Sequence, residues 1–128
     1  MADRPEDRVY QLIGEDGFTR LVAAFYRQVV TDDILGPMYP HEDMAGAEKR
    51  LRDFLIFRFG GPNRYIVERG HPALRMRHAP FQINQAGRDR WVLLMDNAFQ
   101  EAQLPKEAED KLREFFEGAA TFMINAAG

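Results

Sequence analysis

Residues 17–30 decide the fold class, and they read Gly-Phe-Thr-Arg-Leu-Val-Ala-Ala-Phe-Tyr-Arg-Gln-Val-Val. The apolar side chains recur at intervals of three and four residues, which places them on one face of an α-helix. The apolar positions are Phe18, Leu21, Val22, Phe25, Tyr26, Val29 and Val30. No stretch of the chain alternates as a β-strand does, so the sequence predicts an all-α protein.

Helix breakers mark the next elements along the chain. Pro37 and Pro40 end the first helix and leave room only for a turn or a short 3₁₀ piece. Asp43 is an acceptable N-cap for a second helix. The run Gly60-Gly61-Pro62 is a strong stop signal for that helix.

The second half of the chain contains a loop-rich middle followed by two longer helices. Residues 62–73 hold three breakers and predict an irregular loop, after which residues 74–79 can form about two helical turns. Residues 84–103 and the segment that Pro105 opens again show helical apolar spacing. We therefore expect two helix pairs within a single domain, residues 1–128.

Composition excludes several classes of protein. The chain has 128 residues and no cysteine, which rules out disulfides, thiolate metal sites and cysteine nucleophiles. No apolar run approaches the length of about 20 residues that spans a bilayer, and the N-terminus is polar, so we expect a cytoplasmic protein without a membrane partner. The net charge of −3 argues against nucleic-acid binding.

Arginines are concentrated in one part of this acidic chain. Residues 64–90 contain six arginines against two acidic residues. Because a guanidinium group binds planar anions through two parallel hydrogen bonds, this cluster suits carboxylate or phosphate groups. A solvated helix face accounts for the same charge pattern, and both interpretations remain open.

The run Arg77-His78-Ala79-Pro80-Phe81 places one imidazole at the end of the short helix. A residue before proline is excluded from the α region, so Ala79 closes the helix and His78 lies on its last turn. A metal-binding histidine can be held rigidly there. Most histidines among apolar neighbours, however, only find a hydrogen-bond partner.

Polar aromatic residues interrupt the apolar helix faces. Tyr26 and Trp91 each carry a donor that needs a partner when buried, and Tyr39 lies in the proline-rich turn. An imidazole, several hydroxyl or indole donors and nearby arginines together describe a site for a flat apolar cofactor with two carboxylates. Haem has these properties.

Ordered motifs across residues 14–125 resemble the truncated, two-over-two haemoglobins of the second group. The matching segments are Phe25-Tyr26, Tyr39-Pro40, residues 45–48, 50–55, 60–62, 69–72 and 74–81, and Trp91. The Gly-Gly-Pro run followed by Gly-His-Pro and Arg-His-Ala-Pro-Phe is the most specific part. Many relatives have adjacent glycines near the first helix, whereas this chain has Gly14-Glu15-Asp16-Gly17, which leaves the turn of the N-terminal segment open.

The resemblance implies a two-over-two helical sandwich around haem b, with His78 as the proximal iron ligand. It places the donors Tyr26, Tyr39 and Trp91 on the distal side of the haem. The other implied pocket residues are Leu51 on the distal side, Ala47 where many globins have a distal histidine, Arg50, Tyr65 and Arg77 at the propionates, and Phe54, Leu74, Met76 and Phe81 along the walls.

The expected function is reversible binding of O2, CO and NO for oxygen transport, storage or sensing, with an external reductase and a homodimer as implied partners. The second hypothesis is a haem redox enzyme that acts on nitric oxide or peroxide, although the sequence shows no distal His–Arg pair for peroxidase chemistry. The third is a cofactor-free helical domain whose arginines bind an anionic partner. A zinc site formed by His41, His71 and His78 is a further alternative. The spacings of these histidines in the sequence match no compact zinc-ligand motif.

Overall fold

The computed structural model describes residues 7–70 and 83–124, and within these ranges every regular element is helical. The α-helices are α1 (Arg8–Val29), α2 (Met44–Arg58), α3 (Arg64–Arg69), α5 (Gln85–Ala102) and α6 (Lys106–Phe122). Two 3₁₀ turns, η2 (Gly36–Met38) and η3 (His41–Asp43), lie between α1 and α2. The predicted all-α fold class is confirmed.

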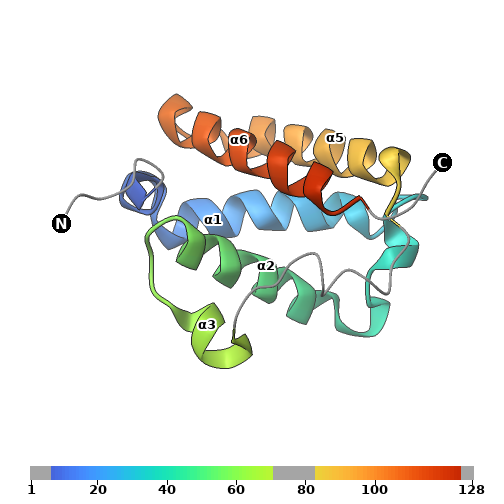
Figure 1. The fold of residues 1–128 in the computed structure, drawn as a ribbon, viewed down its shortest axis with the longest axis horizontal. Coiled ribbons are helices and arrows are strands. Elements are labelled where there is room, and N and C mark those ends of the chain that lie inside the picture. Colours follow the sequence, from blue (N-terminus) through green and yellow to red (C-terminus); the bar gives the residue numbers. More distant parts are fainter. Residues whose placement is uncertain (1–6, 71–82, 125–128) are drawn as a thin grey trace.

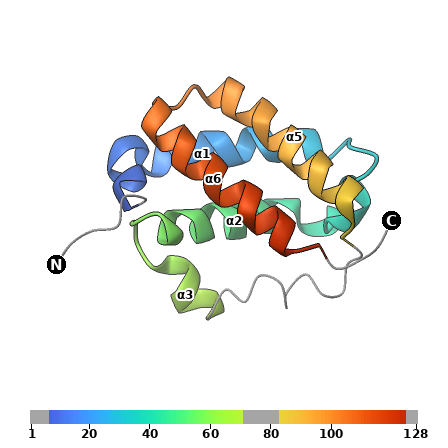
Figure 2. The same cartoon turned by 45° about the horizontal axis from the view of Figure 1, so that its top comes forward.

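Helix α1 is the centre of the fold and contacts α2, α5 and α6. Figure 1 shows α5 and α6 together on one side of α1, with α2 on the other side. In the turned view, α6 runs obliquely across α1 (Figure 2). The pairs α1/α2 and α5/α6 therefore stack as two layers, in agreement with the predicted sandwich.

The first helix is longer than its apolar spacing predicted. It begins at Arg8 and continues through a kink at Gly14, whose φ of 62° lies in the left-handed region that glycine enters without strain. Before the kink, the Tyr10 N–H donates to the carbonyl of Phe59 at 3.1 Å. This bond joins the N-terminal turn to the end of α2, so Gly14 supplies the change of direction that the sequence left open.

Helix α2 begins and ends at the predicted signals. The Asp43 carboxylate accepts a hydrogen bond from the Gly46 N–H at 3.2 Å, which confirms it as the N-cap. The helix ends at Arg58, and Gly60 follows with a φ of 97°. A Cβ atom at Gly60 would lie 2.4 Å from the carbonyl oxygen of Asp7, so the backbone approach here requires glycine.

The prediction of an irregular loop over residues 62–73 was wrong for its first part, because α3 occupies Arg64–Arg69. The breakers Pro62 and Gly70 lie on either side of this six-residue helix, so they bound it without interrupting it. Gly70 ends the helix with a φ of 77°. The short helix predicted over residues 74–79 lies outside the described residues.

Helices α5 and α6 also follow their predicted signals. The Asn84 side chain caps α5 by accepting from the Gly87 N–H at 2.9 Å. Gln103 ends α5 in a left-handed conformation. Pro105 lies immediately before α6 and not in its first turn. None of the helices in the described part of the chain is both long and apolar enough to cross a membrane.

Candidate cofactor site

A cavity of about 600 Å³ is lined by residues of all five described α-helices and of the turn between α1 and α2. Its volume lies within the roughly 300–1,000 Å³ that is typical of small-molecule and cofactor sites. Most of the lining is aliphatic or aromatic. The two helix pairs therefore enclose space that their own side chains do not fill.

Eight of the predicted site residues lie in the described part of the chain, and the structure brings all eight to this cavity. They are Tyr26, Tyr39, Ala47, Arg50, Leu51, Phe54, Tyr65 and Trp91. The other five predicted residues lie outside the described residues. They are Leu74, Met76, Arg77, His78 and Phe81.

Three polar aromatic residues form one wall of the cavity. The buried Tyr26 hydroxyl donates to the Ala47 carbonyl at 3.2 Å. The Tyr39 ring meets the Tyr26 ring edge-on, with 5.6 Å between their centroids. The indole N–H of Trp91 faces the Tyr39 hydroxyl as a polar contact. The side chains thus lie side by side although they come from α1, the turn after η2, and α5.

Both tyrosines stay protonated over the physiological pH range. Burial raises the pKa of Tyr39 to about 12, although the polar contact with Trp91 favours the anion. Burial also raises the pKa of Tyr26, and the neighbouring Tyr39 adds to this shift. Each hydroxyl therefore keeps one proton that it can donate.

Aromatic packing fixes the position of Trp91. Its ring centroid lies 5.1 Å from that of Phe25 on α1 and 5.1 Å from that of Phe116 on α6. These contacts hold the indole between the two layers while its N–H reaches Tyr39. Replacing the indole by leucine would keep apolar bulk but lose this donor.

Helix α6 supplies the part of the lining that sequence reasoning missed. The lining residues are Phe115, Phe116, Ala119 and Ala120 of α6 and Met123, which directly follows it. The sequence predicted helical apolar spacing over this segment, but not its place at the cavity. Apolar spacing shows which face turns inward, but it does not distinguish a face packed on protein from a face that lines a cavity.

The arginine cluster divides once the chain is folded. Arg69 and Arg88 line the cavity together with Arg50 of α2. Arg64 instead pairs with Glu15 at 3.1 Å, and Arg90 pairs with Asp32 at 2.7 Å. Thus both interpretations of the cluster apply in part: some of its arginines face the cavity, and others make ion pairs away from it.

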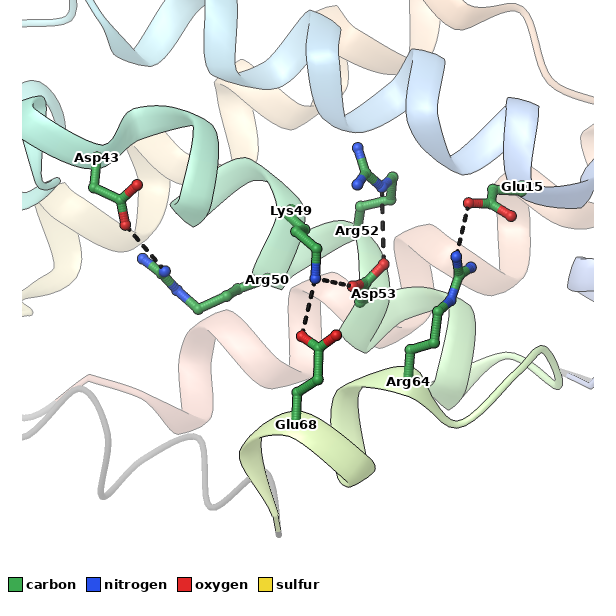
Figure 3. A network of polar contacts seen from close by, with 8 residues as sticks. All are labelled: Glu15, Asp43, Lys49, Arg50, Arg52, Asp53, Arg64 and Glu68. Atoms are coloured by element: carbon green, nitrogen blue, oxygen red, sulfur yellow. Dashed lines mark hydrogen bonds and ion pairs between the residues drawn. The ribbon is translucent and has the colours of Figure 1, made fainter.

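A polar network docks α3 onto α2 and α1 (Figure 3). The Lys49 ammonium contacts Asp53 at 3.0 Å and Glu68 of α3 at 2.9 Å. Asp53 is only 3% exposed. Because α3 carries Tyr65 and Arg69 to the cavity, this network positions one of its walls. Sequence reasoning missed Asp53, whose place beside Phe54 on the inward face of α2 was the available signal.

His41, a member of the alternative zinc site, makes a structural contact instead. Its Nε2 lies 2.8 Å from the Gly36 carbonyl oxygen, which makes the ring a donor within the turn. His71 and His78 lie outside the described residues. Within residues 7–70 and 83–124, no three side chains of the metal-binding types gather closely enough to hold an ion.

The cavity fits a haem group. Aromatic and aliphatic side chains offer an apolar surface for a flat macrocycle, and the arginines Arg50, Arg69 and Arg88 offer donors for its carboxylates. Tyrosine and tryptophan donors face the interior. Two stacked helix pairs around such a cavity define a globin.

Comparison with known proteins places the chain within this class. Residues 8–125 match the family model described as bacterial-like globin. The chain is 35% identical over 116 residues to the group 2 truncated haemoglobin YjbI of Bacillus subtilis, covering 91% of this chain and 87% of that protein.

Solved structures agree with this match. A thermostable haemoglobin from Thermobifida fusca shares 47% identity, with a TM-score of 0.87 over 91% of this chain and 96% of that one. The haemoglobin of Chloroflexus aurantiacus shares 42% identity, with a TM-score of 0.88 over 91% of this chain and 97% of that one. The chain belongs to the bacterial-like globin family, as a group II truncated haemoglobin.

Membership of this family identifies the cofactor as haem b and the general activity as haem-based binding of diatomic gases. The hypothesis of a cofactor-free interaction domain is therefore wrong. Its basis, the arginine cluster, is consistent with carboxylate contacts at a cofactor.

Proposed function

We propose that the chain binds O2, CO and NO reversibly and retains oxygen strongly, with His78 as the proximal iron ligand and Tyr39 and Trp91 as the principal distal donors. Haem b, when bound, supplies the iron at which a diatomic ligand is taken up and released. The observation that carries the proposal is the wall of the cavity on which Tyr26, Tyr39 and Trp91 lie side by side.

The three residues of the polar wall have different roles, because only some of their donor protons already have an acceptor in the protein. A tyrosine hydroxyl donates one proton, and that of Tyr26 is directed to the Ala47 carbonyl. The Tyr39 hydroxyl faces the Trp91 indole, which cannot accept its proton, so that proton remains available for a ligand in the cavity. We therefore assign the direct donation to Tyr39 and to Trp91, and a supporting role to Tyr26.

The strength of a donor's hydrogen bond to the ligand determines how much that donor slows oxygen release. A ligand that gains negative charge is stabilised by a donor by about 1.5–3 kcal/mol, which corresponds to a roughly tenfold to hundredfold slower release. Oxygen gains more charge than the less polar carbon monoxide. The donors should therefore slow oxygen release much more than carbon monoxide release.

The remaining assignments describe how the chain holds haem. Arg50 and Tyr65, with Arg77, contact the propionates, and the cavity adds Arg69 and Arg88 as further candidates. Phe54 and Leu51, with Leu74, Met76 and Phe81, pack against the macrocycle. Ala47 leaves the distal entrance small and apolar.

The proximal assignment is tested by absorption spectroscopy of the purified protein reconstituted with haem. The wild type should show an intense Soret band with the spectrum of a histidine-ligated haem. His78→Gly should lose this spectrum and recover it on addition of imidazole. An undiminished spectrum in His78→Gly without imidazole would refute the assignment.

The distal assignment is tested by oxygen release after rapid mixing with a trap. Tyr39→Phe and Trp91→Phe should each release oxygen at least about tenfold faster than the wild type, because each loses a donor. Release at the wild-type rate in both variants would remove the basis of the distal proposal.

Redox turnover of nitric oxide or peroxide is the alternative at the same cavity, and it would require an external reductase. Among the described lining residues, arginines occur without a histidine to act as the acid–base partner that peroxidases use. Ligand binding therefore has the better support. Steady-state turnover with a defined reductant separates the two: sustained turnover would favour the enzyme.

A further inference from the structure

Asp32 organises the turn that leads from α1 to Tyr39. Its Oδ2 accepts hydrogen bonds from the N–H groups of Ile34 at 3.0 Å and Leu35 at 2.8 Å. Its backbone carbonyl accepts from the Gly36 N–H at 3.0 Å. The side chain is only 6% exposed. Asp32 thus fixes the backbone that enters η2. This turn begins three residues before Tyr39.

Arg90 joins this turn to α5. Its Nη1 contacts the other carboxylate oxygen of Asp32, Oδ1, at 2.7 Å and the Oδ1 of Asp33 at 3.2 Å. Arg90 directly precedes Trp91 in α5. Each carboxylate oxygen of Asp32 therefore contacts a different element. Oδ2 holds the turn that carries Tyr39, and Oδ1 holds the helix that carries Trp91.

Neither Asp32 nor Arg90 lines the cavity. We propose that the Asp32–Arg90 pair is a positioning device, which sets the turn of Tyr39 against Trp91 and thereby sets how slowly oxygen is released. This inference rests on the proposed roles of Tyr39 and Trp91 as donors. Asp32 and Arg90 act through those two residues and do not touch the ligand.

The charge states of Asp32 and Arg90 favour their ion pair at neutral pH. Burial alone would raise the pKa of Asp32, but hydrogen bonds from Leu35, Arg90 and Ile34 outweigh burial and lower it. The carboxylate is therefore ionised and can hold both partners. Asp33 also contacts Arg90, but its side chain is 86% exposed and makes a weak, solvent-screened pair.

Asp33 provides a matched control, because Asp33→Asn and Asp32→Asn remove the same charge from neighbouring positions. Asp32→Asn keeps an amide oxygen for the turn but loses the ion pair with Arg90. Arg90→Met keeps the aliphatic stem and removes the charge, whereas Arg90→Lys keeps the charge. We expect Asp32→Asn and Arg90→Met to release oxygen about three- to tenfold faster, Arg90→Lys to recover part of the wild-type rate, and Asp33→Asn to match the wild type.

A second measurement reads the position of Trp91 directly. Trp91 is the only tryptophan of the chain, so the carbon monoxide form of the ¹⁵N-labelled holoprotein gives a single indole N–H resonance. A change in the polar contact with Tyr39 should shift this resonance and change its exchange with solvent. Asp32→Asn and Arg90→Met should both show the change, and Asp33→Asn should not.

The outcomes separate this inference from the proposed function. If Tyr39→Phe and Trp91→Phe speed oxygen release while Asp32→Asn and Arg90→Met leave both the rate and the indole resonance unchanged, the positioning role is refuted and the donor roles stand. If the donor variants leave the rate unchanged, the donor roles fail. The indole resonance then decides by itself whether the pair positions Trp91. Should Asp32→Asn not fold, Arg90→Met decides in its place.

Discussion

At the residue scale, whether its hydroxyl proton already has an acceptor decides what each tyrosine can do. Tyr26 and Tyr39 are both phenols on the same wall, with their rings 5.6 Å apart. Tyr26 donates to a backbone carbonyl of α2, whereas Tyr39 faces the Trp91 indole, which cannot accept its proton. The sequence marked both residues as donors, but their partners come from distant parts of the chain and follow only from the packing.

Tyr26→Phe should therefore affect stability more than oxygen release. The change removes one buried hydrogen bond, which costs about 1 kcal/mol of unfolding free energy. Urea unfolding should show this loss, while oxygen release should speed up far less than in Tyr39→Phe. Equal acceleration in the two variants would mean that the Tyr26 proton reaches the ligand.

The lowered pKa of Asp32 predicts how the ion pair responds to acid. A carboxyl group whose pKa is lower in the folded chain stabilises the fold at pH values above its ordinary pKa of about 3.9. This contribution is lost as the pH falls through the lowered value. The stability advantage of the wild type over Asp32→Asn should be full at pH 6 and should shrink below about pH 4.

Urea unfolding at several pH values measures this difference. Asp33→Asn serves as the control, because its side chain is exposed and does not hold the turn. An advantage of the wild type over Asp32→Asn that stays constant down to pH 3 would contradict the prediction.

At the element scale, short-range signals set where helices begin and end. Asp43 caps α2 and the glycines after Arg58 stop it, as the sequence predicted, and Asn84 caps α5. Helix α3 was missed because its six residues are too few for a clear apolar period and lie among breakers. What holds α3 is tertiary: Tyr65 packs edge-on against Phe54 at 5.4 Å, and Glu68 pairs with Lys49.

Lys49→Met should loosen α3 from α2. The substitution keeps an unbranched side chain but leaves the buried Asp53 with Arg52, at 3.8 Å, as its remaining ion-pair partner among the described residues. We expect a lower unfolding temperature and faster transfer of haem to an acceptor protein, because α3 carries part of the cavity wall. Lys106→Met is the control, since it breaks an exposed pair with Asp110 within α6. Equal effects in the two variants would argue against the docking role.

Two glycine substitutions should change the free energy of unfolding in opposite directions. Gly60→Ala should destabilise the protein by roughly 1–3 kcal/mol, because φ is 97° and the new Cβ would meet the Asp7 carbonyl. Gly118→Ala in α6 should stabilise it by about 0.5–1 kcal/mol, because no neighbour in the described part of the chain lies within 4 Å of the new Cβ and alanine favours the helix. Thermal unfolding measures both changes, and a neutral Gly60→Ala would refute the proposed backbone constraint.

At the scale of the whole molecule, two helix pairs enclose a cavity of about 600 Å³. A folded chain of this kind is incompletely packed without its cofactor, since the cavity walls lose contacts across the gap. The fold and the cofactor therefore stabilise each other. Haem binding adds to stability in proportion to its affinity for the folded chain.

Removal of haem should lower the unfolding temperature, and reconstitution should restore it. Circular dichroism on heating measures the helical content of both forms. Because binding to the folded state alone raises stability, excess haem should raise the unfolding temperature further. Identical unfolding temperatures with and without haem would show that the cofactor does not support the fold.

The sequence by itself determined the longer helices, the cap and stop of α2, and the residue types that a haem site needs, because these depend on spacing and on neighbours within a few positions. The tertiary structure alone decided the division of the arginines between cavity and ion pairs, the existence of α3, the partner of each tyrosine, and the link from Asp32 to Arg90. These contacts join residues far apart in the chain, such as Tyr26 with Ala47 and Asp32 with Arg90. Local periodicity carries no information about which distant groups meet.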